Sequence, residues 1–147
     1  MRTIEYDPEI PLIRMIDQRQ LPENVEILAL RDLDQVIHAI RDMAVRGAPA
    51  IGITAAFGLA LFGRLSTASS ISAWRLELEE AGVLLVKARP TAVNLRWAVD
   101  RVQTTLDSFA NDDLEQARSH LDTLVQTMAD KDVVINRRMA QAFEKSS

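Results

Sequence analysis

Hydrophobic and polar positions follow two different periods along the chain, and the change falls close to residue 31. Before it, apolar residues occur in short runs rich in β-forming types, each bounded by Pro or Asp, at 3–6, 11–17 and 24–30. Runs of this length predict three short strands in a small antiparallel sheet. Prolines are confined to sheet edges and turns, which is where we expect Pro8, Pro11 and Pro22.

From Asp32 onward the apolar positions recur every three or four residues, which is the period of a helix with one buried face. The first such run consists of Leu33, Val36, Ile37, Ile40 and Ala44. We expect Gly47 to end this helix by adopting a left-handed conformation. A second helix, at about 50–64, is apolar on all sides and is therefore predicted to be the central buried element.

Three further helices are predicted from capping residues. Ser70 or Ser72 opens the third, to which Leu76, Val83 and Leu84 belong. The fourth runs over about 92–109 with Thr91 as its N-cap. A capping box with Asp112 as cap and Glu115 reaching back opens the fifth, which continues past Val134 to about 142. The apolar stripe of this last helix is Leu114, Ala117, Leu121, Leu124 and Met128.

The predicted fold is thus α+β and mainly helical, with a small N-terminal antiparallel sheet of about three strands followed by a bundle of about five helices. A chain of 147 residues fits one domain, with the sheet in 1–30 and the helices in 31–147.

Composition narrows the function classes. The net charge is −4 with both signs interspersed, so we expect no nucleic-acid and no membrane partner. The longest apolar run, near 48–62, contains glycines and is expected to be too short to span a bilayer. The chain has no Cys and its first residues are too polar for a signal peptide, which favours a cytoplasmic protein.

One candidate site is the turn between the first two helices, Arg46-Gly47-Ala48-Pro49. Pro49 suits the first turn of a helix, whose unpaired N–H groups and dipole attract anions. Small Ala48 lets a ligand approach that backbone, and Arg46 adds a bidentate donor for phosphate. The alternative is that Gly47 and Pro49 only separate two helices while Arg46 is solvated, and spacing alone favours this alternative.

A second turn, Arg89-Pro90-Thr91, has the same design, with an Arg before a Pro and a new helix after it. It too can be a plain connector. Two such turns facing each other could hold one phosphate dianion, although spacing does not establish that they do.

The remaining chemistry-bearing residues give weak signals. His38 and His120 lie on separate helices without carboxylates at ligand spacing, so no metal site is predicted. Trp74 and Trp97 are interpreted as packing residues, and no catalytic residue is assigned.

Residues 40–52 and 89–95, with 3–6, 17–19 and 136–137, closely resemble the S-methyl-5-thioribose-1-phosphate isomerase family. Its superfamily includes the regulatory subunits of initiation factor 2B and ribose-1,5-bisphosphate isomerase. The resemblance implies aldose–ketose isomerisation, an intramolecular oxidoreduction, of 5-methylthioribose 1-phosphate in methionine salvage, with no metal or organic cofactor. It also implies that Arg46, Gly47, Ala48 and Arg89 contact the sugar phosphate.

The same resemblance sets a limit, because the family's acid–base pair, a Cys and an Asp, lies in a second, Rossmann-like domain. The 147 residues contain no Cys and end before that domain is expected, so this chain is interpreted as a truncated N-terminal domain without turnover. Ribose 1,5-bisphosphate stays open as a substrate. The second hypothesis is a non-catalytic interaction or regulatory module, whose last helix packs on a partner or on a second copy in a dimer.

Overall fold

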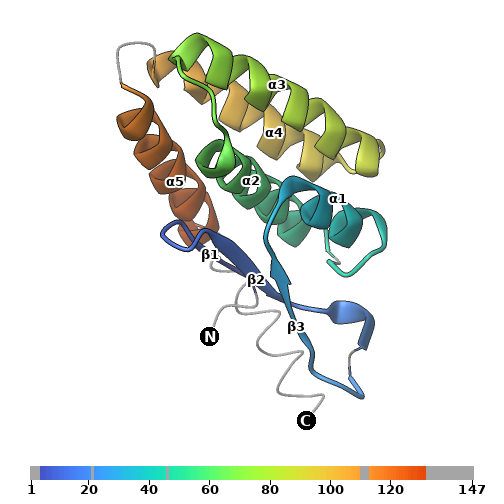
Figure 1. Ribbon diagram of the computed structural model, residues 1–147. Helices are drawn as coiled ribbons and strands as arrows, with labels where there is room; N and C mark the ends of the chain where they lie inside the picture. Colours follow the sequence, from blue (N-terminus) through green and yellow to red (C-terminus); the bar gives the residue numbers. More distant parts are fainter. Residues whose placement is uncertain (1–3, 21, 46, 110–112, 132–147) are drawn as a thin grey trace.

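The computed structural model describes residues 4–20, 22–45, 47–109 and 113–131, which form a three-stranded sheet and five α-helices (Figure 1). The strands are β1 (Ile4–Asp7), β2 (Leu12–Ile16) and β3 (Ile27–Leu30). The helices are α1 (Leu33–Arg41), α2 (Ala48–Leu65), α3 (Ile71–Ala88), α4 (Val93–Leu106) and α5 (Leu114–Lys131). The predicted α+β, mainly helical fold with a small N-terminal sheet is confirmed.

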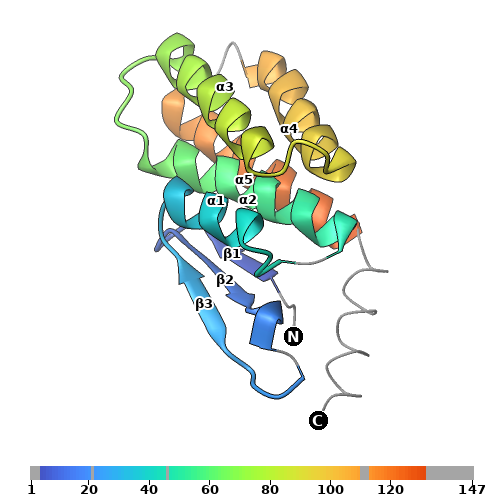
Figure 2. The same ribbon diagram turned by 90° about the vertical axis from the view of Figure 1, so that its right-hand side faces the viewer.

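The sheet is antiparallel with the strand order β1-β2-β3, so each strand pairs with its neighbour in sequence. Ile13 in the middle strand lies opposite Tyr6 on one side and Leu30 on the other, and all three are buried. Pro8 and Pro11 lie in the turn between β1 and β2, as expected. The two views show the sheet on one side of α2, and α3 with α4 on the other (Figures 1 and 2).

Helix α2 is the central element, as its continuous apolar character predicted. The most extensive helix–helix contacts in the domain are those of α2 with α4 and with α5. Helix α2 also contacts both β1 and β2. The expectation that this run is too short for a bilayer is wrong on length, because α2 has 18 residues and enough hydropathy to span one. However, 67% of that helix is buried inside the domain, which is the pattern of a core helix.

The end of α1 differs from the prediction. The helix ends at Arg41, and the left-handed residue of its C-terminal turn is Met43, with a φ of 64°. Gly47 also has a positive φ, of 89°, but it lies further along the chain, as the N-cap of α2. The Ala44 N–H donates to the Ala39 carbonyl and the Met43 N–H to the Ile40 carbonyl, which is the Schellman pattern of a helix C-terminus. Gly47 was predicted because glycine adopts this conformation without strain.

The N-caps are partly as predicted. Ser70 caps α3, since its side chain accepts a hydrogen bond from the Ala73 N–H. Thr91 does not cap α4, whose N-cap is Ala92 without a side-chain bond, so that prediction was wrong. In α5 the Asp113 carboxylate accepts from the Gln116 N–H at 2.7 Å. Asp112 lies outside the described residues, as does the predicted continuation to about 142.

The apolar stripe of α5 faces the core of this domain. Ala117 and Leu121 are fully buried, and Leu114, Leu124 and Met128 are half-buried against the same core. The stripe proposed for a partner is therefore already packed, chiefly against α2. In Figure 1, α5 runs beside α2 with its far end close to the sheet.

Candidate functional site

The predicted anion-binding turn lies at the N-terminus of α2. Gly47 is the N-cap, with φ of 89° and ψ of 126°, a conformation that L side chains rarely adopt. The first intrahelical bond runs from the Ile51 N–H to the Gly47 carbonyl oxygen. Because Pro49 has no N–H, the helix leaves the amides of Ala48 and Ala50 without intrahelical acceptors. Backbone donors at the positive end of a long helix dipole are suited to an anion.

The surroundings of this turn are open. Gly47, Ala48 and Pro49 are all exposed, and a Cβ built on Gly47 meets no atom within 4 Å. A ligand can therefore approach the backbone of α2 directly. Arg46, the side chain predicted to complete the turn, lies outside the described residues, so its role stays a prediction.

The second turn connects α3 to α4. Arg89 is the C-cap of α3, and its carbonyl oxygen accepts from the Ala92 N–H at 3.0 Å, which closes a tight turn around Pro90. The Arg96 guanidinium donates to the Pro90 carbonyl oxygen at 2.9 Å and so braces the turn from the first part of α4. Among the described residues, no carboxylate forms an ion pair with half-buried Arg89.

The helices that follow the two turns approach each other closely near their N-termini. A Cβ added to Gly52, in the second turn of α2, would lie 2.9 Å from the carbonyl oxygen of Asn94, in the first turn of α4. The same Cβ would lie 3.5 Å from the Cβ of Ala98. The two helices can pack backbone against backbone only because residue 52 is a glycine. In both views their N-terminal ends lie at the same side of the molecule (Figures 1 and 2).

A hollow of about 280 Å³ opens beside this contact, between α2, α4 and the end of α5. It is lined by Pro49, Gly52, Ile53, Asn94, Trp97, Ala98, Arg101, Met128 and Lys131. Pro49 links the hollow to the first turn of α2. Arg89, the second predicted cation, is not in this lining. The hollow is therefore distinct from the predicted phosphate contacts, and the two regions adjoin at Pro49 in the first turn of α2.

Trp74 and Trp97 were both expected to be packing residues, but they lie in different surroundings in the structure. Trp74 is fully buried, and its indole N–H donates to the Gly63 carbonyl oxygen at 2.9 Å, as expected of a packing residue. For Trp97 the prediction was wrong, because 57% of the residue is exposed at the hollow. The Arg101 guanidinium lies 5.5 Å from the centre of its ring. The sequence did contain one sign of this exposed position. Trp97 lies near the start of α4, shortly after the predicted anion-binding turn at 89–91.

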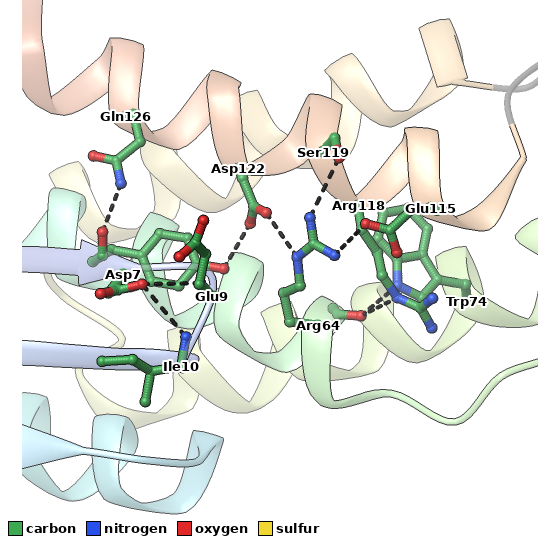
Figure 3. A network of polar contacts seen from close by, with 12 residues as sticks. Asp7, Glu9, Ile10, Arg64, Trp74, Glu115, Arg118, Ser119, Asp122 and Gln126 are labelled. Carbon is green, nitrogen blue, oxygen red and sulfur yellow. Dashed lines mark hydrogen bonds and ion pairs between the residues drawn. The ribbon is translucent and has the colours of Figure 1, made fainter.

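A polar cluster lies at the opposite end of α2, where it joins β1, α2 and α5 (Figure 3). The Tyr6 hydroxyl donates to Asp122 Oδ1 at 2.6 Å, and Arg64 Nε donates to Asp122 Oδ2 at 2.8 Å. Arg64 also binds Glu115 and Ser119 on the same face of α5. Arg118 donates to the carbonyl oxygens of Gly63 and Ser66. None of these residues stood out in the sequence, because their partners come from distant segments.

Burial dominates the electrostatics of this cluster. It raises the pKa of the Asp122 carboxyl above the ordinary 3.8, although the hydrogen bonds from Tyr6 and Arg64 pull it down. Burial also raises the pKa of the Tyr6 hydroxyl, and the hydrogen bond to the Asp122 carboxylate adds to this. For Arg64, burial lowers the pKa, but hydrogen bonds to Glu115 and Asp122 outweigh that and raise it overall. The cluster therefore joins the sheet to the helices through hydrogen bonds that meet at the buried Asp122 carboxyl group.

The histidines lie apart from these sites. The His38 ring shares a hydrogen bond with the Asp34 carbonyl oxygen on the exposed side of α1, and the His120 ring packs near Phe109. Within residues 4–20, 22–45, 47–109 and 113–131, no group of three or more His, Cys, Asp or Glu side chains is placed to hold a metal ion.

The sequence model of the initiation factor 2 subunit family matches residues 44–146, a span that includes both turns and the hollow. The chain belongs to this family. Among curated relatives, a methylthioribose-1-phosphate isomerase from Herpetosiphon aurantiacus is 41% identical over 141 residues, 96% of this chain. One of the same name from Synechococcus is 45% identical over 129 residues, 86% of this chain.

Solved structures of the family have the same fold. The 5-methylthioribose 1-phosphate isomerase of Pyrococcus horikoshii superposes with a TM-score of 0.84 over 90% of this chain, at 37% identity. The delta subunit of translation initiation factor eIF-2B from A. fulgidus gives 0.81 at 30% identity, also over 90% of this chain. The chain spans 39% of the length of the Herpetosiphon relative and 36% of the Pyrococcus structure.

Proposed function

We propose that these 147 residues form the N-terminal, substrate-binding domain of a methylthioribose-1-phosphate isomerase. The relatives at 41% and 45% identity carry that name, and their similarity covers 96% and 86% of the chain. In this proposal the domain binds 5-methylthioribose 1-phosphate, which the complete enzyme isomerises from aldose to ketose in methionine salvage. A metabolic enzyme of this kind is expected in the cytoplasm.

The observation that carries the proposal is the close packing of α2 on α4 at Gly52 and Asn94. It supports a single anion site built from two helix N-termini, in which the backbone amide of exposed Ala48 binds the phosphate. Gly47 permits the backbone turn that exposes this amide, and Arg46 and Arg89 supply charge. A guanidinium binds phosphate with two parallel hydrogen bonds, so each Arg contributes both charge and orientation.

We further propose that this domain does not isomerise the sugar by itself. Removing a proton from a sugar carbon needs an acid–base group within hydrogen-bond reach of it. The polar side chains that line the hollow are Asn94, Arg101 and Lys131, and no carboxylate, His or Cys is among the described residues of its lining. The family's Cys has no counterpart in these residues, since the sequence contains no Cys. Turnover is therefore assigned to a second, Rossmann-like domain.

Titration of the purified chain with a pentose 1-phosphate tests the site. Arg46→Ala and Arg89→Ala should each weaken binding by roughly 10- to 150-fold, the loss of a charge-assisted contact of about 1.5–3 kcal/mol. Arg75→Ala is the matched control, because Arg75, on α3, pairs with Asp107 at the end of α4 and does not line the hollow. Equal affinity of all four proteins would remove the phosphate site from these turns.

A coupled assay for ketose formation tests the absence of turnover. The chain should give no rate above the uncatalysed reaction. Appreciable turnover by these 147 residues would mean that acid–base groups within them do the chemistry and that the division between domains is wrong.

The similarity to the eIF-2B delta subunit favours one alternative, a regulatory module that binds a partner and catalyses nothing. Both hypotheses are consistent with the same fold, so the binding of a sugar phosphate distinguishes between them. Saturable binding of a pentose 1-phosphate that depends on Arg89 favours the isomerase domain. Its absence, together with self-association in light scattering that grows with concentration, favours the module.

A further inference from the structure

The hollow beside the predicted anion-binding turn at the N-terminus of α2 has an apolar surface that would not contact a bound phosphate. Ile53 and Met128 are half-buried there, and Trp97 is 57% exposed. An accessible tryptophan set in a recess with other apolar side chains is typical of a ligand site, because its ring offers a large contact area with few rotatable bonds. The three side chains come from three helices, α2, α4 and α5, so the tertiary fold creates this surface.

We propose that Ile53, Trp97 and Met128 form the subsite for the thioether substituent of the sugar phosphate and so determine its specificity. The inference rests on the proposed function, since the phosphate must occupy the N-terminal turn of α2. Ile53 lies one helical turn beyond Pro49, about 5.4 Å along the axis. A pentose with its phosphate at the turn can therefore place the substituent at its other end over this surface.

The chemistry of the lining matches a methylthio group. A thioether is apolar and polarisable, and sulfur makes favourable contacts with aromatic rings. Trp97 supplies the ring, and the Arg101 guanidinium, 5.5 Å from the ring centre, covers part of it and restricts its orientation. Met128 is flexible and can adjust to the shape of the substituent.

A second phosphate is the competing occupant, because Arg101 and Lys131 also line the hollow. Both cations are exposed, so they remain hydrated and attract an anion only through screened charge. A phosphate seated on Ile53, Trp97 and Met128 would lose hydration against apolar atoms, which is costly. The lining therefore favours the thioether.

Tryptophan fluorescence gives a direct reading of this subsite. The chain has two tryptophans, and Trp74 is fully buried, so a change of emission on ligand binding reports Trp97. With 5-methylthioribose 1-phosphate the emission should shift to shorter wavelength as water leaves the ring. The shift should be absent in Trp97→Phe.

Affinity for three ligands completes the test. 5-Methylthioribose 1-phosphate should bind about 10-fold or more tightly than ribose 1-phosphate, the scale of a small apolar group in a fitted pocket. Trp97→Ala and Met128→Gln should each reduce that ratio towards one, whereas Arg89→Ala should weaken both ligands equally. Val93→Ala is the control, since Val93 is 77% exposed on α4 and outside the hollow.

The outcomes separate the two proposals. Equal binding of the methylthio and unsubstituted sugars, still dependent on Arg89, overturns the subsite and leaves the phosphate site. Tightest binding of ribose 1,5-bisphosphate, lost in Arg101→Gln, overturns it in favour of a second anion. No binding of any of the three ligands overturns the proposed function and this inference with it.

Discussion

The Tyr6 hydroxyl donates a 2.6 Å hydrogen bond to the buried carboxylate of Asp122, 116 positions further along the chain. This bond joins the first strand to the last described helix, and the side chain of Gln126 adds a second link to the Tyr6 carbonyl oxygen. Sheet and helices are thus fastened at the edge where β1 meets α5. In Figure 3 the side chains of Arg64 and Asp122 point toward each other across this junction.

Replacing Asp122 by Ala should destabilise the domain by roughly 3–5 kcal/mol, because Tyr6 and Arg64 would both lose a buried acceptor. Tyr6→Phe should cost less, about 1–2 kcal/mol, since Arg64 still neutralises the carboxylate. Urea unfolding followed by circular dichroism measures both values.

The matched control for these variants is Asp107→Ala. Asp107 also pairs with an Arg, but its side chain is 77% exposed, and such pairs contribute about 0–1 kcal/mol. If Asp122→Ala cost no more than this control, the cluster would have no special part in holding the sheet to the helices.

The raised pKa of Asp122 makes its contribution to stability depend on pH. Folding raises the pKa above the ordinary 3.8. At pH values between the unfolded and the folded pKa, the folded state therefore binds more protons than the unfolded state. Stability from this group is therefore fully present below about pH 4 and is lost as the pH rises through the folded pKa. The cost of Asp122→Asn should accordingly be largest in acid and become smaller towards neutral pH.

Carbon NMR of the Asp122 carboxyl checks the cause directly. Its titration midpoint in the folded chain should lie above that of the same residue in the urea-unfolded chain. A folded midpoint below the unfolded one would mean that the bonds from Tyr6 and Arg64 outweigh burial, and the pH trend would then reverse.

Met43→Gly should stabilise the protein by about 1 kcal/mol. Met43 has a φ of 64°, where an L side chain is strained and glycine is not. The residue is 44% exposed, so little packing is lost. Thermal unfolding measures the gain, and Met43→Ala is the control, because alanine keeps the strain and should bring no such increase.

Gly52→Ala should destabilise the domain by about 1–3 kcal/mol, although alanine is the better helix former. The added methyl would meet the Asn94 carbonyl oxygen at 2.9 Å, and a backbone atom cannot rotate away as a side chain can. Gly58→Ala provides the comparison, since its methyl would meet a side-chain carbon of Val36 at the same distance. Denaturant unfolding should show the larger loss for Gly52→Ala, and equal losses would contradict this explanation.

Much of the fold follows from local patterns. The strands were located because short β-rich runs end at Pro or Asp, and α2 because no face of it is polar. The errors arose where tertiary structure overrides local preference. Met43 takes the conformation expected of Gly47 because the turn after α1 has to bring Ala44 and Val45 into the core, where both are fully buried.

The candidate site was only partly predictable. The turn at Gly47 could be predicted because a glycine followed by a proline marks the start of a helix from the local sequence alone. The hollow could not, since Ile53, Trp97 and Met128 meet only after three helices have packed. Asp122 gave no signal for the same reason, as its partners Tyr6 and Arg64 lie on other elements.

The absence of a side chain at Gly52 has a consequence for affinity. Two helices in backbone contact cannot slide past each other without a clash, so the first turns of α2 and α4 move as one body. A ligand that bridges them meets donors already in place and spends little conformational entropy on ordering them. A side chain at residue 52 would thus act at a distance from any bound phosphate, by loosening the frame that keeps the two turns in register.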